Sequence, residues 1–188
     1  PFAARVSAKL REKHPNLSIE IYSESTRAIA RRLNDFSLDA GILYFDDGDP
    51  ETTEKLYEER YVFIAPNSLT ILKKKQITWE EVAQFPLCLL TQNMRNRQLI
   101  DQQFLELGIS PNIVTEASDF TGVLAQVALG NAATIAPISV AETFLDLKST
   151  VHLDLTHPVM IHSVGLSIKD QSPVLPIIKA LRQAVKAV

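Results

Sequence analysis

An α/β fold with mostly parallel sheets and helical cover is the class that this 188-residue sequence predicts. Short apolar runs, typical of strands buried on both faces, alternate with segments whose apolar residues recur every three or four positions. Turn and capping residues separate these segments. Near the end the alternation stops, and residues 159–168 form a long extended stretch with no helix directly before it. Alternating strands and helices favour parallel sheets covered by helices.

The first elements follow from local patterns. Residues 2–13 carry an apolar residue every fourth position and predict a helix, which His14-Pro15 ends because proline disfavours helical geometry in the residue before it. Residues 17–21 alternate apolar and polar side chains and predict a half-buried strand. A helix follows, with N-cap candidates at Ser23, Ser25 and Thr26 and an apolar stripe at Ile29, Leu33 and Phe36. Residues 40–43 predict a buried parallel strand.

Later elements have clear starts and stops. Thr78 and Glu81 form a capping box, while Gly108 and Gly130 are placed to end helices. The acidic residues 46–50 lack the ligand spacing of a calcium loop and are interpreted as an exposed connection. The expected elements are strands at 61–65, 87–90, 113–115, 133–136 and 159–168, and helices at 78–84, 96–107, 120–129 and from Pro173 through Val185.

The composition is that of a globular protein, with 46% hydrophobic and 22% charged residues. The net charge of −3 and the short run Lys73-Lys74-Lys75 do not provide the basic face that binding to DNA phosphates needs. No apolar run approaches the ~18 residues of a membrane helix. Residues 1–5 lack the pattern of a secretion signal, so we expect a cytoplasmic protein with no membrane contact, although a trimmed sequence would have lost such a signal.

The single cysteine, Cys88, excludes an internal disulfide and fits a reducing compartment. Its neighbours are leucines, so a buried, inert thiol is favoured over a nucleophile. His152, His157 and His162 are five residues apart, which matches neither helix nor strand periodicity and argues against a metal site. No Gly-x-Ser-x-Gly elbow, P-loop or dinucleotide fingerprint is present. We therefore expect no catalytic residue, no metal and no cofactor.

Three segments together resemble the LysR-type transcription regulators of bacteria. They are residues 10–21 (LREKHPNLSIEI), 33–42 (LNDFSLDAGI) and 124–137 (LAQVALGNAATIAP). The likeness spans nearly the whole chain and implies a fold like the type 2 periplasmic binding proteins. One departure lies in the last segment, where the family's usual Gly-x-Gly is replaced by Gly130-Asn131-Ala132-Ala133.

The resemblance also implies an organisation and a function. Two α/β lobes, residues 1–64 with 164–188 and residues 67–160, would be joined by two crossing strands, with an effector cleft between them. A winged helix-turn-helix, a linker helix and one strand would precede Pro1, and DNA would be bound only through that upstream domain. Such modules pair antiparallel through their first helix and first strand, which implies a homodimer here and a tetramer in the full-length form.

A narrower likeness involves residues 87–101 (LCLLTQNMRNRQLID). It is similar to a subgroup of these regulators that is associated with formate dehydrogenase genes. It implies formate, or another small carboxylate, as the effector.

Candidate effector contacts follow from the expected sheets, because ligands of parallel α/β sheets bind beyond the carboxyl ends of strands, near helix N-termini. By resemblance, Thr26 matches a frequent ligand-contacting threonine. Arg95 or Arg97 could pair with a carboxylate, or either could be a solvated surface arginine. For Asp119 an N-cap role, and for Phe120 and Tyr44 a packing role, remain alternatives. The predicted effector-binding residues are Ser23, Ser25, Thr26, Tyr44, Thr91, Gln92, Asn93, Arg95, Asp119 and Phe120.

Two other functions share this scaffold. A free-standing solute-binding protein of a transporter would need an export signal and would normally be a monomer. An enzyme, such as those of tetrapyrrole or histidine synthesis, would need a catalytic or cofactor-bearing residue. The sequence favours the ligand-sensing domain of a transcription regulator over both.

Overall fold

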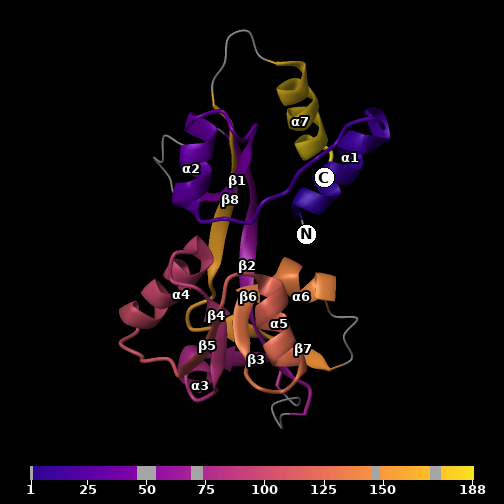
Figure 1. The fold of residues 1–188 in the computed structure, drawn as a ribbon. Helices are drawn as coiled ribbons and strands as arrows, with labels where there is room; N and C mark the ends of the chain where they lie inside the picture. Colours follow the sequence, from indigo (N-terminus) through magenta and orange to yellow (C-terminus); the bar gives the residue numbers. More distant parts are fainter. Residues whose placement is uncertain (1, 46–53, 69–73, 145–148, 170–174) are drawn as a thin grey trace. The chain divides into compact units, whose positions relative to one another are not determined.

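The computed structural model describes residues 2–45, 54–68, 74–144, 149–169 and 175–188. The chain divides into two compact units, which are Pro1–Glu58 with His162–Val188 (unit 1) and Glu59–Ile161 (unit 2). The chain passes into unit 2 within strand β2 (Glu54–Pro66) and returns at the start of strand β8 (Ile161–Ser167). The expected α/β composition is present in both units (Figure 1).

Unit 1 is built around the packing of helix α1 (Phe2–Lys13) against helix α7 (Pro176–Lys186) (Figure 1). Val6 and Leu10 of α1 are buried together with Ile178, Ala184 and Val185 of α7 in one apolar cluster. The four-residue spacing in α1 therefore predicted both the helix and its buried face. Helix α7 begins at Pro176 rather than at Pro173, which lies outside the described residues.

Strand β1 (Gly41–Phe45) differs in direction from the prediction. It pairs antiparallel with β8, with Leu43 opposite Gly165. Leu43 is buried, whereas Ile42 and Tyr44 are half-buried. This alternation is what one covered face produces, so the prediction of a parallel strand buried on both faces is wrong.

Helix α2 (Thr26–Asn34) begins as predicted but ends before Phe36. Leu33 is buried in the helix, whereas Phe36 lies beyond it, at a φ of 58°, and is 58% exposed. The expected apolar stripe therefore holds for Leu33 but is wrong for Phe36. Spacing alone could not show that the helix had already ended.

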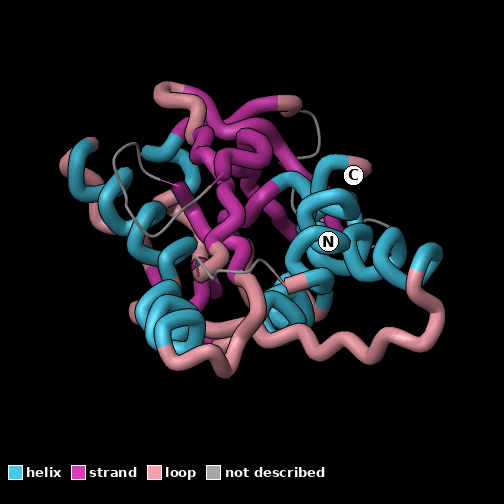
Figure 2. The backbone as a smooth tube through the Cα atoms, turned by 90° about the horizontal axis from the view of Figure 1, so that it is seen from above, coloured by secondary structure: helices cyan, strands magenta, loops and turns pink. Residues whose placement is uncertain are grey.

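Residues 17–21 form no strand with any part of the chain that the structure describes, and this prediction is wrong (Figure 2). Leu17 and Ile19 still pack against the apolar cluster of unit 1, whereas Ile21 is 60% exposed. The alternation of apolar and polar residues thus predicted that Leu17 and Ile19 are covered. It does not indicate whether the backbone pairs with a neighbouring strand.

Unit 2 contains two sheets with helices around them. In one sheet, β2 pairs antiparallel with two strands, and a short strand is added in parallel at β7; in the other, β4 and β5 are parallel. The elements of unit 2 are β3 (Gln76–Thr78), α3 (Trp79–Val82), β4 (Leu87–Leu90), α4 (Arg95–Glu106), β5 (Ile113–Ala117), α5 (Phe120–Ala128), β6 (Thr134–Pro137), α6 (Ile138–Phe144) and β7 (Thr150–Thr156).

Most predicted elements of unit 2 are confirmed. The capping box at α3 is complete, because the Thr78 hydroxyl accepts from the Glu81 N–H and the Glu81 carboxylate accepts from the Thr78 N–H. Strand β4 is buried along its whole length. Helices α4 and α5 end near Gly108 and Gly130, as expected. Strands β3 and β7 and helix α6 were not predicted. No helix within the described ranges combines the length and apolar character needed to cross a membrane.

Gly41 at the start of β1 is a point where helix α2 approaches the strand closely. A Cβ there would lie 2.7 Å from Cγ2 of Ile29 and 3.4 Å from Cδ1 of Leu33. The branched Ile29 side chain has little rotamer freedom in a helix and cannot easily move away. We therefore expect Gly41→Ala to lower the free energy of unfolding by about 1–3 kcal/mol, the usual cost of overpacking.

Urea denaturation of Gly41→Ala, Ile29→Ala and the double variant measures this effect. Removing Cγ2 of Ile29 makes room for the new methyl group, so the double variant should lose less stability than the two single losses added together. Strictly additive losses would show that the contact with Ile29 is not the cause.

Candidate functional site

The N-terminal turn of α2 presents the predicted residues of unit 1. Ser25 is the N-cap, and its hydroxyl accepts a hydrogen bond from the Ala28 N–H at 3.3 Å. Thr26 is the first residue of the helix and is half-buried, whereas Ser23 is exposed. Within the described part of the chain, the Thr26 side chain makes no hydrogen bond. Ser25 therefore holds the turn together, and Thr26 presents a hydroxyl beside the first N–H groups of the helix.

Tyr44 lies near the end of β1 and is half-buried. Its ring meets the ring of His162 on β8 edge to face, with the centroids 6.3 Å apart. This geometry is a favourable aromatic contact. Tyr44 thus has a packing role in unit 1.

The loop between β4 and α4 holds the next group of predicted residues. The Thr91 N–H donates to the Ala117 carbonyl, and the Thr91 carbonyl accepts from the Met94 N–H, both at 3.0 Å. Gln92 and Asn93 are exposed, and Arg95 is half-buried. The N-cap of α4 is Met94, which makes no side-chain capping bond. The Met94 carbonyl accepts from the Gln98 N–H at 3.1 Å, so the first turn of α4 is closed by a backbone oxygen and has no side-chain cap.

Arg97 is an internal structural residue and does not present its guanidinium to a ligand. Its side chain is 4% exposed. Nη1 donates to the Leu90 carbonyl at 2.9 Å and to the Glu116 carboxylate, and Nε donates to Asp101 Oδ1 at 2.7 Å. Burial acts to lower the pKa of Arg97, but the hydrogen bonds to Asp101 and Glu116 outweigh it and raise the pKa. Arg97 is thus held by partners within unit 2.

The loop between β5 and α5 lies at the same edge as the β4 loop, because Leu90 and Ala117 are partners in the parallel register. Asp119 is the N-cap of α5, and its Oδ1 accepts from the Gly122 N–H at 2.9 Å. Its carboxylate therefore already occupies the positive end of that helix. Phe120 packs against two apolar clusters of unit 2. For these two residues the structure shows the capping and packing roles.

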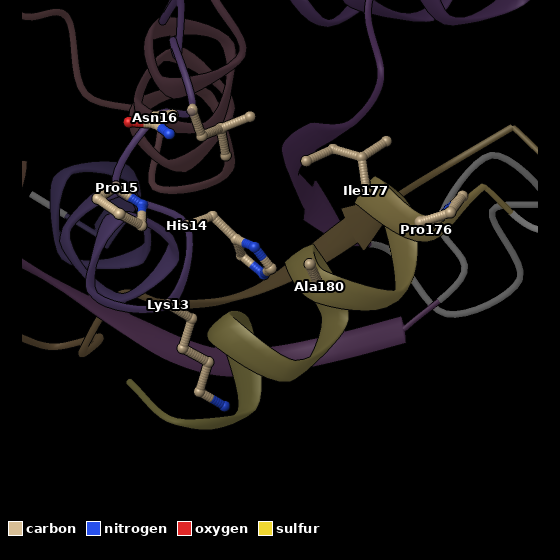
Figure 3. Close-up of a pocket in the computed structure, with 8 residues that line it drawn as sticks. Lys13, His14, Pro15, Asn16, Pro176, Ile177 and Ala180 are labelled. Atoms are coloured by element: carbon tan, nitrogen blue, oxygen red, sulfur yellow. The ribbon is translucent and has the colours of Figure 1, made fainter.

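A pocket of about 520 Å³ lies in unit 1, where residues after α1 face the first turns of α7 (Figure 3). None of its lining residues belongs to the predicted effector set. The sequence did not predict this pocket, because its two sides are far apart in the chain. Pro15 marks the turn on one side and Pro176 the helix start on the other, but neither residue indicates that the two segments meet. The lining residues are Lys13, His14, Pro15, Asn16, Leu17, Pro176, Ile177 and Ala180.

Cys88 lies in the buried strand β4 and is fully covered. Burial raises the pKa of its thiol, so the nucleophilic thiolate is disfavoured. The three histidines that recur every five residues lie in three different segments. His152 is in β7, His157 is exposed in the following turn, and His162 is in β8.

Both units combine helices with strands, and polar residues lie at the starts of α2, α4 and α5. The family model for the LysR substrate binding domain matches residues 2–188, and the chain belongs to this family. The predicted resemblance is thereby confirmed.

Its relatives are transcriptional regulators. CysB of Haemophilus influenzae is 30% identical over 156 residues, which cover 81% of this chain and 47% of CysB. A probable RuBisCO transcriptional regulator of Trieres chinensis is 27% identical over 156 residues, covering 77% of this chain and 50% of that protein. The chain thus spans about half the length of the curated relatives it matches.

Solved structures confirm the fold. The reduced form of the OxyR regulatory domain from Pseudomonas aeruginosa gives a TM-score of 0.82 at 18% identity, covering 98% of this chain and 90% of that one. The effector-binding domain of QuiR in complex with shikimate gives 0.77 at 18% identity, covering 97% and 88%. The chain therefore has the expected α/β fold of the type 2 periplasmic-binding-protein class. It is an effector-binding domain of the LysR type.

Proposed function

We propose that this domain binds a small anionic effector, with Thr26 as the contact residue of unit 1 and the loop of residues 91–95 as the contact segment of unit 2. The observation that carries the proposal is the start of α4. This 12-residue helix begins at Arg95, and its N-cap residue Met94 makes no side-chain capping bond. Helix N-termini carry about half a positive charge and N–H groups without helical partners.

Unit 1 supports the same ligand chemistry independently. The nine-residue helix α2 starts at Thr26, beside the Ser25 cap. A hydroxyl and helix N–H groups together satisfy several lone pairs of a carboxylate without any metal. By contrast, the carboxylate of Asp119 fills the start of α5, so we exclude that helix from the anion contacts.

The full-length protein is proposed to regulate transcription, as its relatives do. A winged helix-turn-helix upstream would bind DNA, and the effector would modulate that binding. The protein would act in the cytoplasm, without enzymatic activity, as a homodimer through this domain and a tetramer in its full-length form. Relatives named as HTH-type transcriptional regulators support this function over a transport protein or an enzyme.

Small carboxylates are the first anions to test. The likeness of residues 87–101 to the subgroup associated with formate dehydrogenase genes makes formate the leading candidate, followed by acetate and small dicarboxylates. The domain of QuiR was solved with shikimate, which supports a small organic effector in this fold.

Thr26→Ala is expected to weaken binding of the preferred anion. A charge-assisted hydrogen bond contributes about 1.5–3 kcal/mol, so the dissociation constant should rise roughly ten- to hundredfold. Isothermal titration calorimetry of wild type and Thr26→Ala with formate, acetate and dicarboxylates measures this. Matched uncharged amides serve as ligand controls.

Thr26→Ser is the matched control variant, because it keeps the hydroxyl and should bind nearly as tightly as wild type. The melting temperature of wild type should also rise with anion concentration, since a ligand of the native state stabilises it. Equal affinity of Thr26→Ala and wild type, or binding of uncharged compounds alone, would contradict the assignment.

A further inference from the structure

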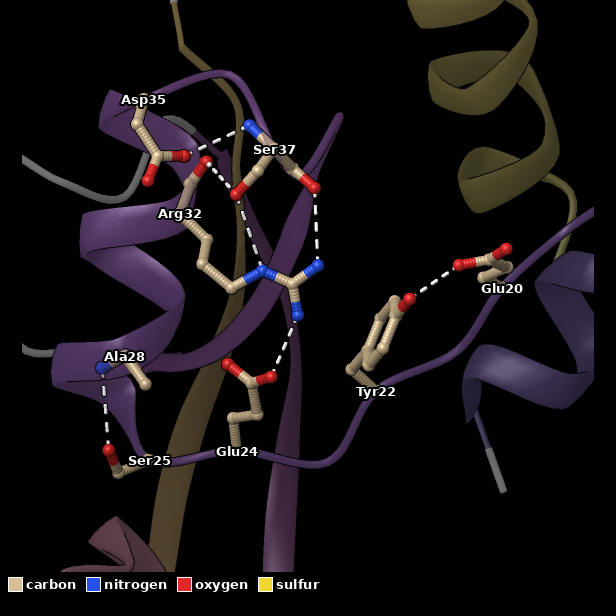
Figure 4. A network of polar contacts seen from close by, with 8 residues as sticks. All are labelled: Glu20, Tyr22, Glu24, Ser25, Ala28, Arg32, Asp35 and Ser37. Atoms are coloured by element: carbon tan, nitrogen blue, oxygen red, sulfur yellow. Dashed lines mark hydrogen bonds and ion pairs between the residues drawn. The ribbon is translucent and has the colours of Figure 1, made fainter.

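Arg32 of α2 connects the segment before the helix with the segment after it (Figure 4). Nη1 donates to the Glu24 carboxylate at 2.7 Å, and Nη2 donates to the Ser37 carbonyl at 3.2 Å. The guanidinium also lies over the Tyr22 ring, 4.1 Å from its centroid. One side chain therefore holds three points of the chain around α2.

The Arg32–Glu24 ion pair lies directly beside the first turn of α2. Glu24 directly precedes the N-cap Ser25, whose hydroxyl closes the first turn of α2. The side chains of Glu24 and Arg32 are 28% and 20% exposed, so water and salt screen the pair less than they would a fully exposed one. Fixing Glu24 thus also fixes the chain immediately before Thr26.

Charge matters as much as position. An unpaired carboxylate beside the start of α2 would repel an incoming anion and would itself be attracted to the helix N-terminus. The guanidinium neutralises that carboxylate. The hydrogen bond to Glu24 is also the main cause that raises the pKa of Arg32, so the arginine stays charged over the whole physiological range.

The far end of the network is anchored too. Ser37 returns a hydrogen bond from its hydroxyl to the Arg32 carbonyl at 3.4 Å, and its N–H donates to Asp35 Oδ1 at 3.0 Å. The Tyr22 hydroxyl donates to the Glu20 carboxylate. The residues that contact the guanidinium, Tyr22 and Ser37, are thus themselves held by hydrogen bonds. The guanidinium can therefore act as a fixed counter-ion of Glu24 rather than as a mobile surface charge.

We propose that Arg32 is a positioning residue for the effector-binding turn: it holds Glu24 as its counter-ion, and so keeps the Ser25–Thr26 turn ordered and open to an anion. This inference rests on the proposed function of Thr26. If the ion pair only stabilised the fold, its loss would lower the melting temperature. Anion affinity would then not depend on whether Glu24 is charged.

The test compares Arg32→Met, Arg31→Met, Glu24→Gln and the double variant Arg32→Met with Glu24→Gln, titrated with formate and acetate by calorimetry. Arg31 is exposed on the same helix, where its charge acts on Asp35, so its substitution removes an equal charge and leaves the pair of Arg32 with Glu24 in place. We expect Arg32→Met to weaken anion binding about tenfold, the scale of one lost charge-assisted contact, and Arg31→Met to have little effect. The double variant should regain the part of the affinity lost to the unpaired carboxylate, but not the part that depends on the ordered turn, because the bond between the two side chains is still missing.

Equal weakening by Arg31→Met and Arg32→Met would overturn the proposal, because net charge would then explain both. A double variant as weak as Arg32→Met would also overturn it. Hydrogen exchange of the Ala28 amide, measured without ligand, separates this inference from the proposed function. Faster exchange in Arg32→Met, but not in Arg31→Met, supports positioning even if wild type binds no anion, and unchanged exchange would refute it.

Discussion

Replacing Trp79 with alanine should destabilise the protein by about 3–5 kcal/mol, as truncation of buried aromatic residues does. Trp79 is completely buried at the start of α3. Its ring contacts Phe104 of α4 edge to face, with the centroids 5.0 Å apart, and its Nε1 donates to the Pro158 carbonyl at 2.9 Å. The substitution therefore removes apolar contacts and a partly buried hydrogen bond together.

Trp79→Phe separates these two contributions, because it keeps an aromatic ring and loses the N–H donor. Its loss should be clearly smaller than that of Trp79→Ala. Urea denaturation followed by far-UV circular dichroism is the suitable measurement, since Trp79 is the only tryptophan and fluorescence would disappear with it. A loss below about 1 kcal/mol for Trp79→Ala, well under the usual cost of such a cavity, would contradict the packing described for unit 2.

Arg97→Ala is expected to cost about 2–4 kcal/mol, because it leaves a buried carbonyl without its donor and opens a void. The carbonyl is that of Leu90 at the end of β4, which accepts from Arg97 Nη1 at 2.9 Å. The carboxylate partners Asp101 and Glu116 are 41% and 39% exposed, so water can hydrate them once the arginine is gone. Most of the loss therefore comes from the carbonyl and from the buried stem of the side chain.

Arg97→Met and Glu116→Gln are the controls for this prediction. Methionine keeps an apolar stem without the donors, so Arg97→Met should recover part of the stability lost in Arg97→Ala. Glu116→Gln leaves Arg97 bonded to Leu90 and Asp101 and should cost less than about 1 kcal/mol, the scale of a partly exposed pair. If Arg97→Ala were as stable as wild type, the guanidinium would have to be a surface group after all.

Local signals predicted most of unit 2. The capping box of Thr78 and Glu81, the all-apolar run of β4 and the glycines that end α4 and α5 each act within a few residues, so the sequence displays them directly. The missed strand β7 also shows an alternation, with Leu153 and Leu155 buried. Its polar members and the nearby histidines obscured that pattern.

Unit 1 was harder to predict because its errors concern partners rather than periodicity. Residues 17–21 alternate as a strand does, yet they have no strand partner among the described residues. The strand β1 is apolar enough for a parallel neighbour, but its neighbour is the antiparallel β8, more than a hundred residues later in the chain. No local pattern encodes which distant segment lies alongside.

The candidate site was predicted in part. The sequence identified the loops after β4 and β5, and the parallel register places them at one edge of the sheet. It did not separate Arg95 from the internal Arg97, whose role depends on a carbonyl at Leu90 and a carboxylate at Glu116. It also did not identify Arg32, because the contacts with Glu24 and Ser37 form only when the chain folds around α2.

Backbone amide chemical shifts, recorded by NMR during titration with formate, acetate and a small dicarboxylate, test most directly where an anion binds. We predict that saturating anion shifts the amides of the first turns of α2 and α4 most strongly, at Thr26 and Arg95 and their neighbours, and that matched uncharged amides leave them unchanged. Shifts concentrated around the pocket at His14 and Ala180, with the first turns of α2 and α4 unaffected, would contradict this account of the domain.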